Sequence, residues 1–271
     1  MSSSIPAETA ADLVCPAPSG RATQAYLDAV ECGRQRAAGA TAVICALARS
    51  VALTLPRMQA QIAALAALFG ETHLVICEND SNDSTRSDLM SWRPPVASYW
   101  LVGKDWDDPI WPRRRDMARA ERMAFYRGFC QNTVLAHCPQ VEYVMTVDFD
   151  LASVSSRGVL HTFAQPDWDA VGSNGLSKIR NKLVQFDAWA WRDFGSDRPL
   201  SWHEVHPRVF SLGQPMLQVN SCFGGMAIYR MEAYKVGVYT GGDCEHVGFH
   251  RTMREAGYGR IYLNPSQTVL Y

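Results

Sequence analysis

Short runs of apolar and β-branched residues alternate along the chain with longer segments in which apolar residues recur every three or four positions. The short runs at residues 41–47, 72–77 and 143–148 predict buried strands, and the helical period at residues 55–69 predicts a helix. A strand, a helix and a second strand in this order form a βαβ unit with parallel strands. We therefore expect an α/β fold with a Rossmann-like, open and mostly parallel sheet flanked by helices.

The rest of the pattern predicts further elements and one domain. Residues 1–20 are rich in Ser, Ala and Pro, which favours a disordered or loosely packed tail. The other expected elements are a helix at 22–38, a strand at 96–102, a helix at 113–137, a short edge strand at 169–172, a turn at 173–177, two strands joined by a glycine turn within 216–229, a helix within 241–257, and closing strands at 261–263 and 268–270. We expect residues 1–40 to be an N-terminal tail and helix, and residues 41–271 to be a single domain.

Composition and charge describe an ordinary soluble globular protein. The chain has 271 residues, a formal net charge of −1 and 47% hydrophobic residues. Its one basic cluster, residues 113–115, is too small for a polyanion-binding face, so we expect no nucleic-acid partner. Eight cysteines without a C-x-x-C pair indicate free thiols in a reducing cytosol.

No targeting segment is expected in this sequence. Its start, MSSSIPAETAADL, lacks the basic and apolar regions of a signal peptide. The longest early apolar run, residues 41–55, is interrupted by Arg49 and is too short to cross a bilayer. We therefore expect a cytoplasmic protein, with at most peripheral contact at the inner face of the membrane.

Asp148 and Asp150 stand at the end of the strand predicted at residues 143–148. In open α/β sheets, ligands bind at the carboxyl ends of the strands, where these two side chains are placed. Carboxylates at positions i and i+2 can face one hard cation, and Mg²⁺ or Mn²⁺ held in this way keeps positions for substrate phosphates. The pattern predicts a metal and diphosphate site, with a solvated strand end before a turn as the alternative.

A second polar segment, residues 78–85, follows the neighbouring predicted strand. Its carboxylates Glu78, Asp80 and Asp83 would lie at the same sheet edge, where they can border the base and ribose of a nucleotide. A long cap and turn before a helix is the alternative. On the helix expected at 113–137, Arg119 and Arg122 lie on one side and could reach a diphosphate, unless they are simply solvated.

Aromatic and glycine residues in the second half indicate a sugar site. Residues 186–195 place Trp189 near Asp187 and Arg192, and aromatic rings with polar neighbours suit the apolar face and hydroxyl rim of a sugar. Buried tryptophan in a core is the alternative. Gly224 and Gly225 allow a ligand to approach the backbone closely.

The helix expected within residues 241–257 begins near two carboxylates, Asp243 and Glu245. After a Gly-Gly turn they can project into the cleft opposite the metal, with helix capping as the alternative. His246 and His250 are four residues apart, a spacing that could hold zinc. The glutamate of an H-E-x-x-H motif is absent, so we favour a structural pair of histidines.

Five segments, in this order, resemble the fungal capsule-associated α-1,3-mannosyltransferase-like family of GT-A glycosyltransferases. They are ENDSNDST at 78–85, VDFD at 147–150, FDAWAWRDFG at 186–195, VNSCFGGMAIY at 219–229 and DCEHVGFHRTMREAGYGRIYLNP at 243–265. The resemblance covers residues 41–271. The chain departs from the family late in the long helix, where Cys130, Gln131 and Asn132 replace an Arg-Asn pair.

The resemblance implies a GT-A fold and the retaining transfer of a hexose, in a soluble bacterial relative without the membrane anchor of the fungal proteins. It favours mannose from GDP-mannose, with a UDP-sugar as the other donor, moved onto a glycan or lipid-linked saccharide in capsule or surface polysaccharide synthesis, with Mn²⁺ or Mg²⁺ as cofactor. With the patterns above, it assigns catalysis to Glu245 and Asp243, metal binding to Asp148 and Asp150, nucleotide-sugar binding to Glu78, Asp80, Asp83, Arg119, Arg122, Asp148, Asn220, Gly224 and Gly225, and acceptor binding to Asp187, Trp189, Arg192 and His246.

Two other functions match parts of the sequence. The segment VDFDLAS, residues 147–153, resembles the start of a haloacid-dehalogenase-like phosphatase, but Ala152 stands where that motif has Thr or Val, and no matching lysine is evident. The third reading is a non-catalytic scaffold that binds a glycan or a nucleotide. Assays of donor hydrolysis separate that scaffold from a transferase.

Overall fold

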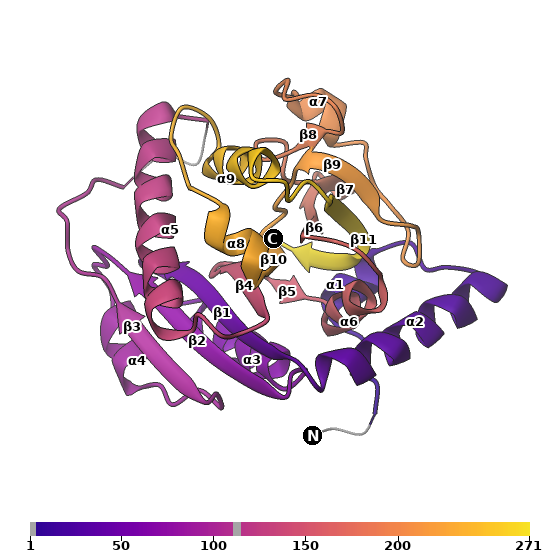
Figure 1. Ribbon diagram of the computed structural model, residues 1–271, viewed down its shortest axis with the longest axis horizontal. Coiled ribbons are helices and arrows are strands. Elements are labelled where there is room, and N and C mark those ends of the chain that lie inside the picture. Colours follow the sequence, from indigo (N-terminus) through magenta and orange to yellow (C-terminus); the bar gives the residue numbers. More distant parts are fainter. Residues whose placement is uncertain (1–3, 111–114) are drawn as a thin grey trace.

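A mixed sheet of eleven strands is the central layer of the computed structural model, which describes residues 4–110 and 115–271 (Figure 1). The strands are β1 (Thr41–Ala48), β2 (Glu71–Glu78), β3 (Ser98–Val102), β4 (Tyr143–Asp148), β5 (Ser153–Val154), β6 (Ala170–Ile179), β7 (Lys182–Gln185), β8 (Arg192–Asp193), β9 (Leu217–Ser221), β10 (Met226–Arg230) and β11 (Ile261–Leu270). Their order in the sheet is β3-β2-β1-β4-β10-β6-β11-β9-β8, with β5 beside β11 and β7 beside β6.

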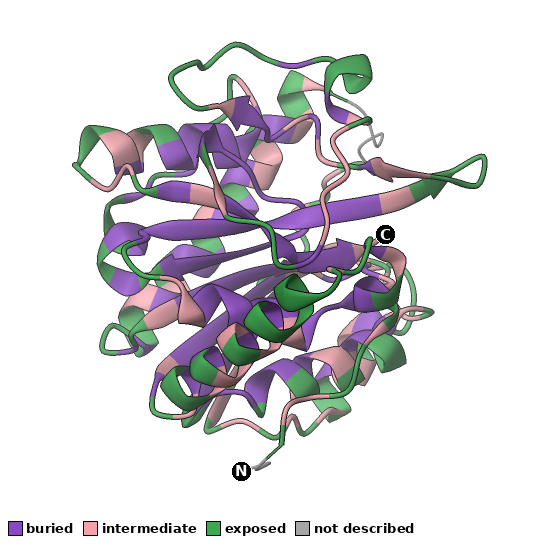
Figure 2. Cartoon of the chain, turned by 90° about the vertical axis from the view of Figure 1, so that its right-hand side faces the viewer, coloured by how far each residue is buried: buried purple, intermediate pink, exposed green. Residues whose placement is uncertain are grey.

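Helices cover both faces of this sheet. They are α1 (Ala10–Val14), α2 (Arg21–Ala37), α3 (Leu55–Ala66), α4 (Thr85–Ser91), α5 (Met117–His137), α6 (Ser156–Ala164), α7 (Trp202–Val205), α8 (Met231–Val236) and α9 (Glu245–Glu255). Alternate residues of β1 belong to two separate cores: Ile44 packs with α2, α3 and α6, whereas Val43 packs with α5, α8 and α9. The central strands are therefore buried between two helical layers, whose outer surfaces are exposed (Figure 2).

The first half of the sheet is parallel and brings several strand ends to one edge. β3, β2, β1 and β4 pair in parallel, and their registers set Ala48 beside Glu78 and Leu47 beside Asp148. β10 runs antiparallel to β4, with Met226 beside Val147, so the turn before β10 reaches the same edge. The backbone N–H of Asp148 donates to the carbonyl of Gly225 over 2.8 Å, which fixes the carboxylate against that turn.

The predicted edge strand and turn at residues 169–177 were wrong. β6 is a ten-residue strand inside the sheet, paired with β10, β11 and β7. The polar residues that suggested a turn are buried and hydrogen-bonded: Asn174 donates to the carbonyl of Pro265 over 3.0 Å, and Ser173 accepts from Gln267 over 3.0 Å. Satisfied polar groups do not interrupt a strand.

The predicted loose tail was also wrong for the described residues from 4 to 20. α1 begins with a capping box between Thr9 and Asp12 and packs against β5 and β11. The N–H of Ala11 donates to the hydroxyl of Ser153 over 3.0 Å, and the Cys15 thiol lies 3.2 Å from the Thr268 hydroxyl. The segment is therefore part of the folded layer over α6 and β11.

The two closing strands expected at 261–263 and 268–270 are one strand, β11. The other predicted elements agree with the sequence expectation to within a few residues, except where a cap decides the boundary. α5 begins at Met117 because Asp116 caps it, with its side chain accepting from the N–H of Arg119. The first residues expected in this helix, Arg113 and Arg114, lie outside the described residues. Within residues 4–110 and 115–271, no helix combines the length and apolar character needed to cross a membrane.

Candidate active site

Two cavities adjoin at the strand edge and share one wall, made by Arg119, Met123, Asp148 and Asp150. The sheet-edge cavity, of about 500 Å³, lies over the ends of β1 and β2 and is also lined by residues 47–51, Leu53, Thr54, Asn79, Asp83, Ile110, Tyr126 and Phe149. The aromatic cavity, of about 190 Å³, is also lined by Arg115, Arg127, Phe186, Asp187, Trp189, Ala190, Trp202, Phe223, Cys244, Glu245, His246 and Tyr271. The two predicted metal carboxylates thus stand between a cavity on the parallel strands and a cavity in the second half of the fold.

Asp148 is held in place through both of its carboxylate oxygens. Oδ1 accepts from Nη2 of Arg127 over 2.7 Å, and Oδ2 accepts from the hydroxyl of Tyr271 over 3.0 Å. Asp150 follows in the turn and lines both cavities. Each carboxylate oxygen has two lone pairs, so these bonds leave acceptor capacity at Asp148.

The candidate metal ligands suit a hard cation that takes its other ligands from a substrate. Asp148 and Asp150 are two carboxylates at a cavity wall, and among the described residues no group of three His, Cys, Asp or Glu side chains is placed to hold a metal. Mg²⁺ and Mn²⁺ accept this arrangement because they commonly bind one or two carboxylates together with phosphate oxygens and water. The residues present therefore fit the predicted cofactor.

Arg127 connects Asp148 to Glu245. Its side chain is only 3% exposed, and its Nε lies 3.7 Å from Oε1 of Glu245, which is an ion pair too long to be a hydrogen bond. Burial raises the pKa of Glu245, and the positive charge of Arg127 partly opposes this shift. Nε and Nη1 of Arg127 are buried without a hydrogen-bond partner. One buried guanidinium therefore balances two carboxylates that face the same cavity.

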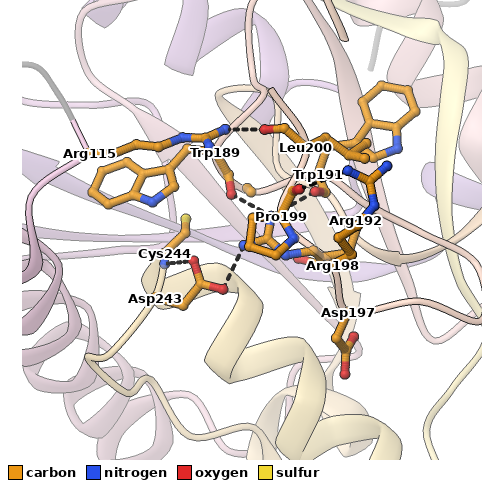
Figure 3. Close-up of polar contacts among 12 residues, drawn as sticks. Arg115, Trp189, Trp191, Arg192, Asp197, Arg198, Pro199, Leu200, Asp243 and Cys244 are labelled. Atoms are coloured by element: carbon orange, nitrogen blue, oxygen red, sulfur yellow. Dashed lines mark hydrogen bonds and ion pairs between the residues drawn. The ribbon is translucent and has the colours of Figure 1, made fainter. Parts of the chain in front are cut away.

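Glu245 is the first residue of α9 and lines the aromatic cavity, whereas Asp243 has other partners. The carboxylate of Asp243 accepts from Nη2 of Arg192 over 2.6 Å and from the N–H of Cys244 over 2.7 Å (Figure 3). Arg192 is fully buried and also donates to the carbonyls of Trp189 and Trp191. These bonds connect the start of α9 to residues 189–193, so Asp243 and Arg192 support the cavity without lining it. Their predicted contacts with sugars stay predictions.

The two histidines of α9 are buried and have different surroundings. The ring of His246 stacks on Phe223 with centroids 3.7 Å apart and lines the aromatic cavity. His250 contacts the hydroxyls of Ser221 at 2.9 Å and Tyr229 at 3.2 Å, and burial lowers its pKa to about 3. Burial also lowers the pKa of His246, so both rings are neutral. His250 has the buried partners of a structural histidine, whereas the acceptor contact predicted for His246 stays a prediction.

Of the three carboxylates predicted to border the nucleoside, only Asp83 lines a cavity. Glu78 is buried and pairs with Arg86. Asp80 accepts from the N–H groups of Trp106 and Asp107 at 2.8 and 2.9 Å, which fastens the loop after β3. Asp83 lines the sheet-edge cavity and accepts from the N–H of Ala52 over 3.1 Å.

The two arginines predicted to bind a diphosphate have different surroundings. Arg119 lines both cavities, and its guanidinium lies over the ring of Trp189 at 5.2 Å. Arg122 forms a salt bridge with Asp108 and lines neither cavity. Asp108 also accepts from Tyr126 over 2.6 Å, so Arg122 belongs to the support of the sheet-edge wall.

The loop after β9 and the segment after β7 are joined through Asp187. Its Oδ2 accepts from the N–H of Gly224 over 2.7 Å, and its Oδ1 accepts from the N–H of Ala190 over 3.0 Å. Gly224 and Gly225 have φ of 65° and 92°, and a Cβ on Gly225 would lie 2.6 Å from the Tyr271 hydroxyl. The glycines are therefore required by packing at this turn. Asn220 lies outside both cavities and bonds Gly195 and Asp197.

Sequence reasoning missed Arg115, Arg127, Phe223 and Tyr271, all of which line the aromatic cavity. Arg127 left a signal: it occupies the buried stripe of α5 with Ala120, Ala124, Gln131 and Val134. A charged residue on the core face of a helix needs a partner, which marks it for a role at a site. Tyr271 reaches Asp148 from a distant strand and left no local signal.

Comparisons with known proteins give structural matches alone. No model of a known protein family matches the sequence, and no curated protein sequence matches it. S. aureus TarS superposes with a TM-score of 0.51 and 12% identity, covering 85% of this chain and 36% of TarS. Residues 1–349 of TarS in complex with UDP-GlcNAc give a TM-score of 0.50 and 12% identity, covering 86% and 58%. The mannosyltransferase PcManGT from Pyrobaculum calidifontis, in complex with GDP-Man and Mn²⁺, gives 0.49 and 16%, covering 93% and 66%.

The GT-A-type α/β fold predicted from the sequence is confirmed. The chain spans less than two thirds of each of these three structures. At these identities the likeness establishes the fold and leaves the assignment of activity to the site itself.

Proposed function

We propose that the protein is a glycosyltransferase that moves a sugar from a nucleotide-sugar donor to a saccharide acceptor, with Mn²⁺ or Mg²⁺ bound at Asp148 and Asp150. The observation that carries the proposal is the shared wall of the two cavities. A nucleotide sugar has a nucleoside at one end, a sugar at the other and a diphosphate between them. The two cavities, with carboxylates and Arg119 between them, have the same sequence of parts.

The donor would lie with its nucleoside in the sheet-edge cavity. Asn79 and Asp83 supply polar groups there, and Leu53 and Ile110 supply exposed apolar side chains. Arg119 can donate to the diphosphate from the shared wall. When bound, the metal would offset the negative charge of the diphosphate and stabilise it as it departs.

Glu245 would face the reacting carbon of the donor sugar. In the transfer, an acceptor hydroxyl oxygen forms a bond to the anomeric carbon, and the bond from that carbon to the diphosphate breaks with its electron pair going to the diphosphate. The hydroxyl proton passes to a diphosphate oxygen. A buried carboxylate stabilises the positive charge that develops on the sugar ring, because its charge is weakly screened in the cavity.

The finer assignment rests on the sequence resemblance: mannose from GDP-mannose, retention at the anomeric carbon, and a glycan or lipid-linked acceptor in surface polysaccharide synthesis. A UDP-sugar is the other donor class, and the TarS structure of the same fold holds UDP-GlcNAc. Retention or inversion can be read by NMR from the one-bond coupling between the anomeric carbon of the product and its proton.

A panel of donors tests the proposal directly. GDP-, UDP-, CMP- and dTDP-sugars are added with and without Mn²⁺, and the melting temperature and the release of nucleotide are measured. A donor at one hundred times its Kd stabilises the folded state by about 2.7 kcal/mol, which is a clear shift. Stabilisation that requires Mn²⁺, with transfer to a saccharide, supports the proposal; no stabilisation by any donor contradicts it.

No observation favours the phosphatase. In that interpretation Asp148 would be the nucleophile, and a lysine is expected beside it. No described lysine lines either cavity. A non-catalytic scaffold would bind the donor without breaking it, and the nucleotide-release measurement separates it from a transferase.

A further inference from the structure

An aromatic wall leads outward from Asp148 along the aromatic cavity. The hydroxyl of Tyr271 donates to Asp148. The ring centroid of Tyr271 lies 4.0 Å from that of Phe186, and the ring centroid of Phe186 lies 6.4 Å from that of Trp202. Phe186 and Trp202 are 37% and 41% exposed, so part of each side chain can contact a ligand. Such a row of rings suits saccharide units, which stack their apolar faces on aromatic side chains.

Arg115 stands at the outer end of this wall. Its guanidinium lies over the Trp202 ring at 5.7 Å, and Nη2 donates to the carbonyl of Ala188 over 2.7 Å. Nη2 also donates to the carbonyl of Leu200 over 2.6 Å (Figure 3). The two carbonyls fix the orientation of the group and use two of its five N–H donors. Among the described residues, Nε and Nη1 have no hydrogen-bond partner and can donate to a ligand.

The charge of Arg115 has no counterpart among the described residues. No described carboxylate lies within ion-pair distance of this exposed side chain, whereas the buried Arg127 of the same cavity is balanced by Asp148 and Glu245. An oriented guanidinium with free donors binds a phosphate or a carboxylate in preference to a neutral hydroxyl, because charge-assisted hydrogen bonds are roughly twice as strong.

We propose that the outer end of the aromatic cavity is an acceptor subsite for a saccharide that carries an anionic group, with the sugar ring against Trp202 and the anion on Arg115. This inference rests on the proposed function, and it specifies the class of acceptor. A phosphate ester and a uronic acid carboxylate share the required chemistry, and the arms of the test distinguish them.

The test measures binding of three matched sugars by NMR titration: methyl mannoside, mannose 6-phosphate and glucuronic acid. Each is titrated into the parent protein alone and into the protein with GDP or UDP and Mn²⁺. We expect at least one anionic sugar to bind ten-fold or more tightly than the neutral one, and the preference to fall as salt is raised, because added ions screen the charge. Equal affinities, or no measurable binding of the anionic sugars, would overturn the proposal.

Variants separate the anion contact from the sugar contact. Arg115→Gln should reduce the preference for anionic over neutral sugars to within two-fold, and Arg115→Lys should retain part of it. Trp202→Ala should weaken the binding of neutral and anionic sugars equally. Arg21→Gln, at an exposed arginine outside the cavity, is the matched control and should change nothing. A preference that survives in a folded Arg115→Gln variant also overturns the proposal.

Nucleotide binding is followed on the same samples, so the two proposals fail separately. Donor binding with no anion preference overturns the acceptor subsite and leaves the transferase proposal intact. Anion preference without any nucleotide binding contradicts the transferase proposal.

Discussion

Asp150 lines both cavities, a position that it shares only with Asp148 among the described carboxylates of the strand edge. We expect Asp150→Asn to abolish Mn²⁺-dependent binding of nucleoside diphosphates, because a neutral amide is a poor ligand for a hard cation. Isothermal titration with GDP and UDP, with and without Mn²⁺, measures this. Asp28→Asn, at an exposed position on α2, is the control. Parental affinity in Mn²⁺ would show that Asp150 is not a metal ligand.

Glu245 can be tested against its alternative role as a helix-terminal charge. As a cap, it would contribute about 0.3–1 kcal/mol through the helix dipole, and its loss would leave turnover almost unchanged. As the group facing the reacting carbon, its replacement in Glu245→Gln should lower kcat by about 100-fold or more with little change in donor affinity. Melting temperature and transfer rate are measured together, with Glu255→Gln at the exposed end of the same helix as control. Turnover within a few-fold of the parent rejects the catalytic role.

Arg127 is the residue on which the charge balance of the site depends. Arg127→Met would leave Asp148 and Glu245 facing each other without a cation, and breaking a buried pair in this way costs about 3–5 kcal/mol. We expect a lower midpoint in urea unfolding, with a smaller loss in Arg127→Lys. Arg251→Met, at an exposed position on α9, should leave the midpoint unchanged. A parental midpoint in Arg127→Met would mean that the ion pairs contribute no net stability.

At the scale of elements, the N-terminal segment braces the strand that carries Tyr271 to the site. Deletion of residues 1–15 removes α1 from β5 and β11 and breaks the hydrogen bond from Ser155 to Asp12. A hydrogen bond to a charged group is worth about 1.5–3 kcal/mol, and buried Ala11 and Cys15 are lost as well. We expect a loss of at least about 2 kcal/mol in urea unfolding, whereas the full-length chain with Asp28→Asn, at an exposed position on α2, should keep the parental midpoint. A parental midpoint in the truncated form would contradict this account.

The parallel half of the fold could be predicted from the sequence because its signals are local. β1, α3, β2 and β4 are continuous apolar or periodic runs, and the positions of Asp148 and Asp150 follow from the end of one strand. The second half could not be predicted in this way. β6 contains Ser173 and Asn174, whose hydrogen bonds come from residues about 90 positions away, so its sequence resembles a turn.

The residues of the candidate site show the same division between local signals and contacts that depend on distant segments. Asp148, Asp150, Trp189 and Glu245 could be chosen by residue type and by their neighbours in the sequence, and all four line a cavity. Glu78, Arg122 and Arg192 were chosen by the same rule, but each has a salt-bridge partner that depends on the tertiary fold. Residue type gives the candidates, and only the packing of distant segments shows which of them face a ligand.

For the whole molecule, buried histidines contribute to the response to acid. Burial lowers the pKa of His161 to about 4 and that of His250 to about 3, against an ordinary value of 6.5. Below pH 6.5 the unfolded chain therefore binds protons that the folded chain does not, and stability is lost as the pH falls from 6.5 towards 4. The loss approaches about 1.4 kcal/mol per pH unit for each group.

Thermal melts from pH 7.5 to 4.5 should show a falling midpoint. Replacing His250, which contacts Ser221 and Tyr229, with Gln should make this decline shallower, because the side chain no longer titrates. His203→Gln, at an exposed position, is the control. A decline of the same slope in His250→Gln would show that other groups cause the acid sensitivity.

The wall shared by the two cavities has a consequence for the order of events in a catalytic cycle. A donor whose diphosphate lies against Arg119, Asp148 and Asp150 would complete one side of the aromatic cavity, so the acceptor would meet a finished pocket only after the donor is in place. The nucleoside diphosphate would then be the last product to leave. Steady-state kinetics should be sequential and ordered, with the nucleoside diphosphate competing against the donor and not against the acceptor.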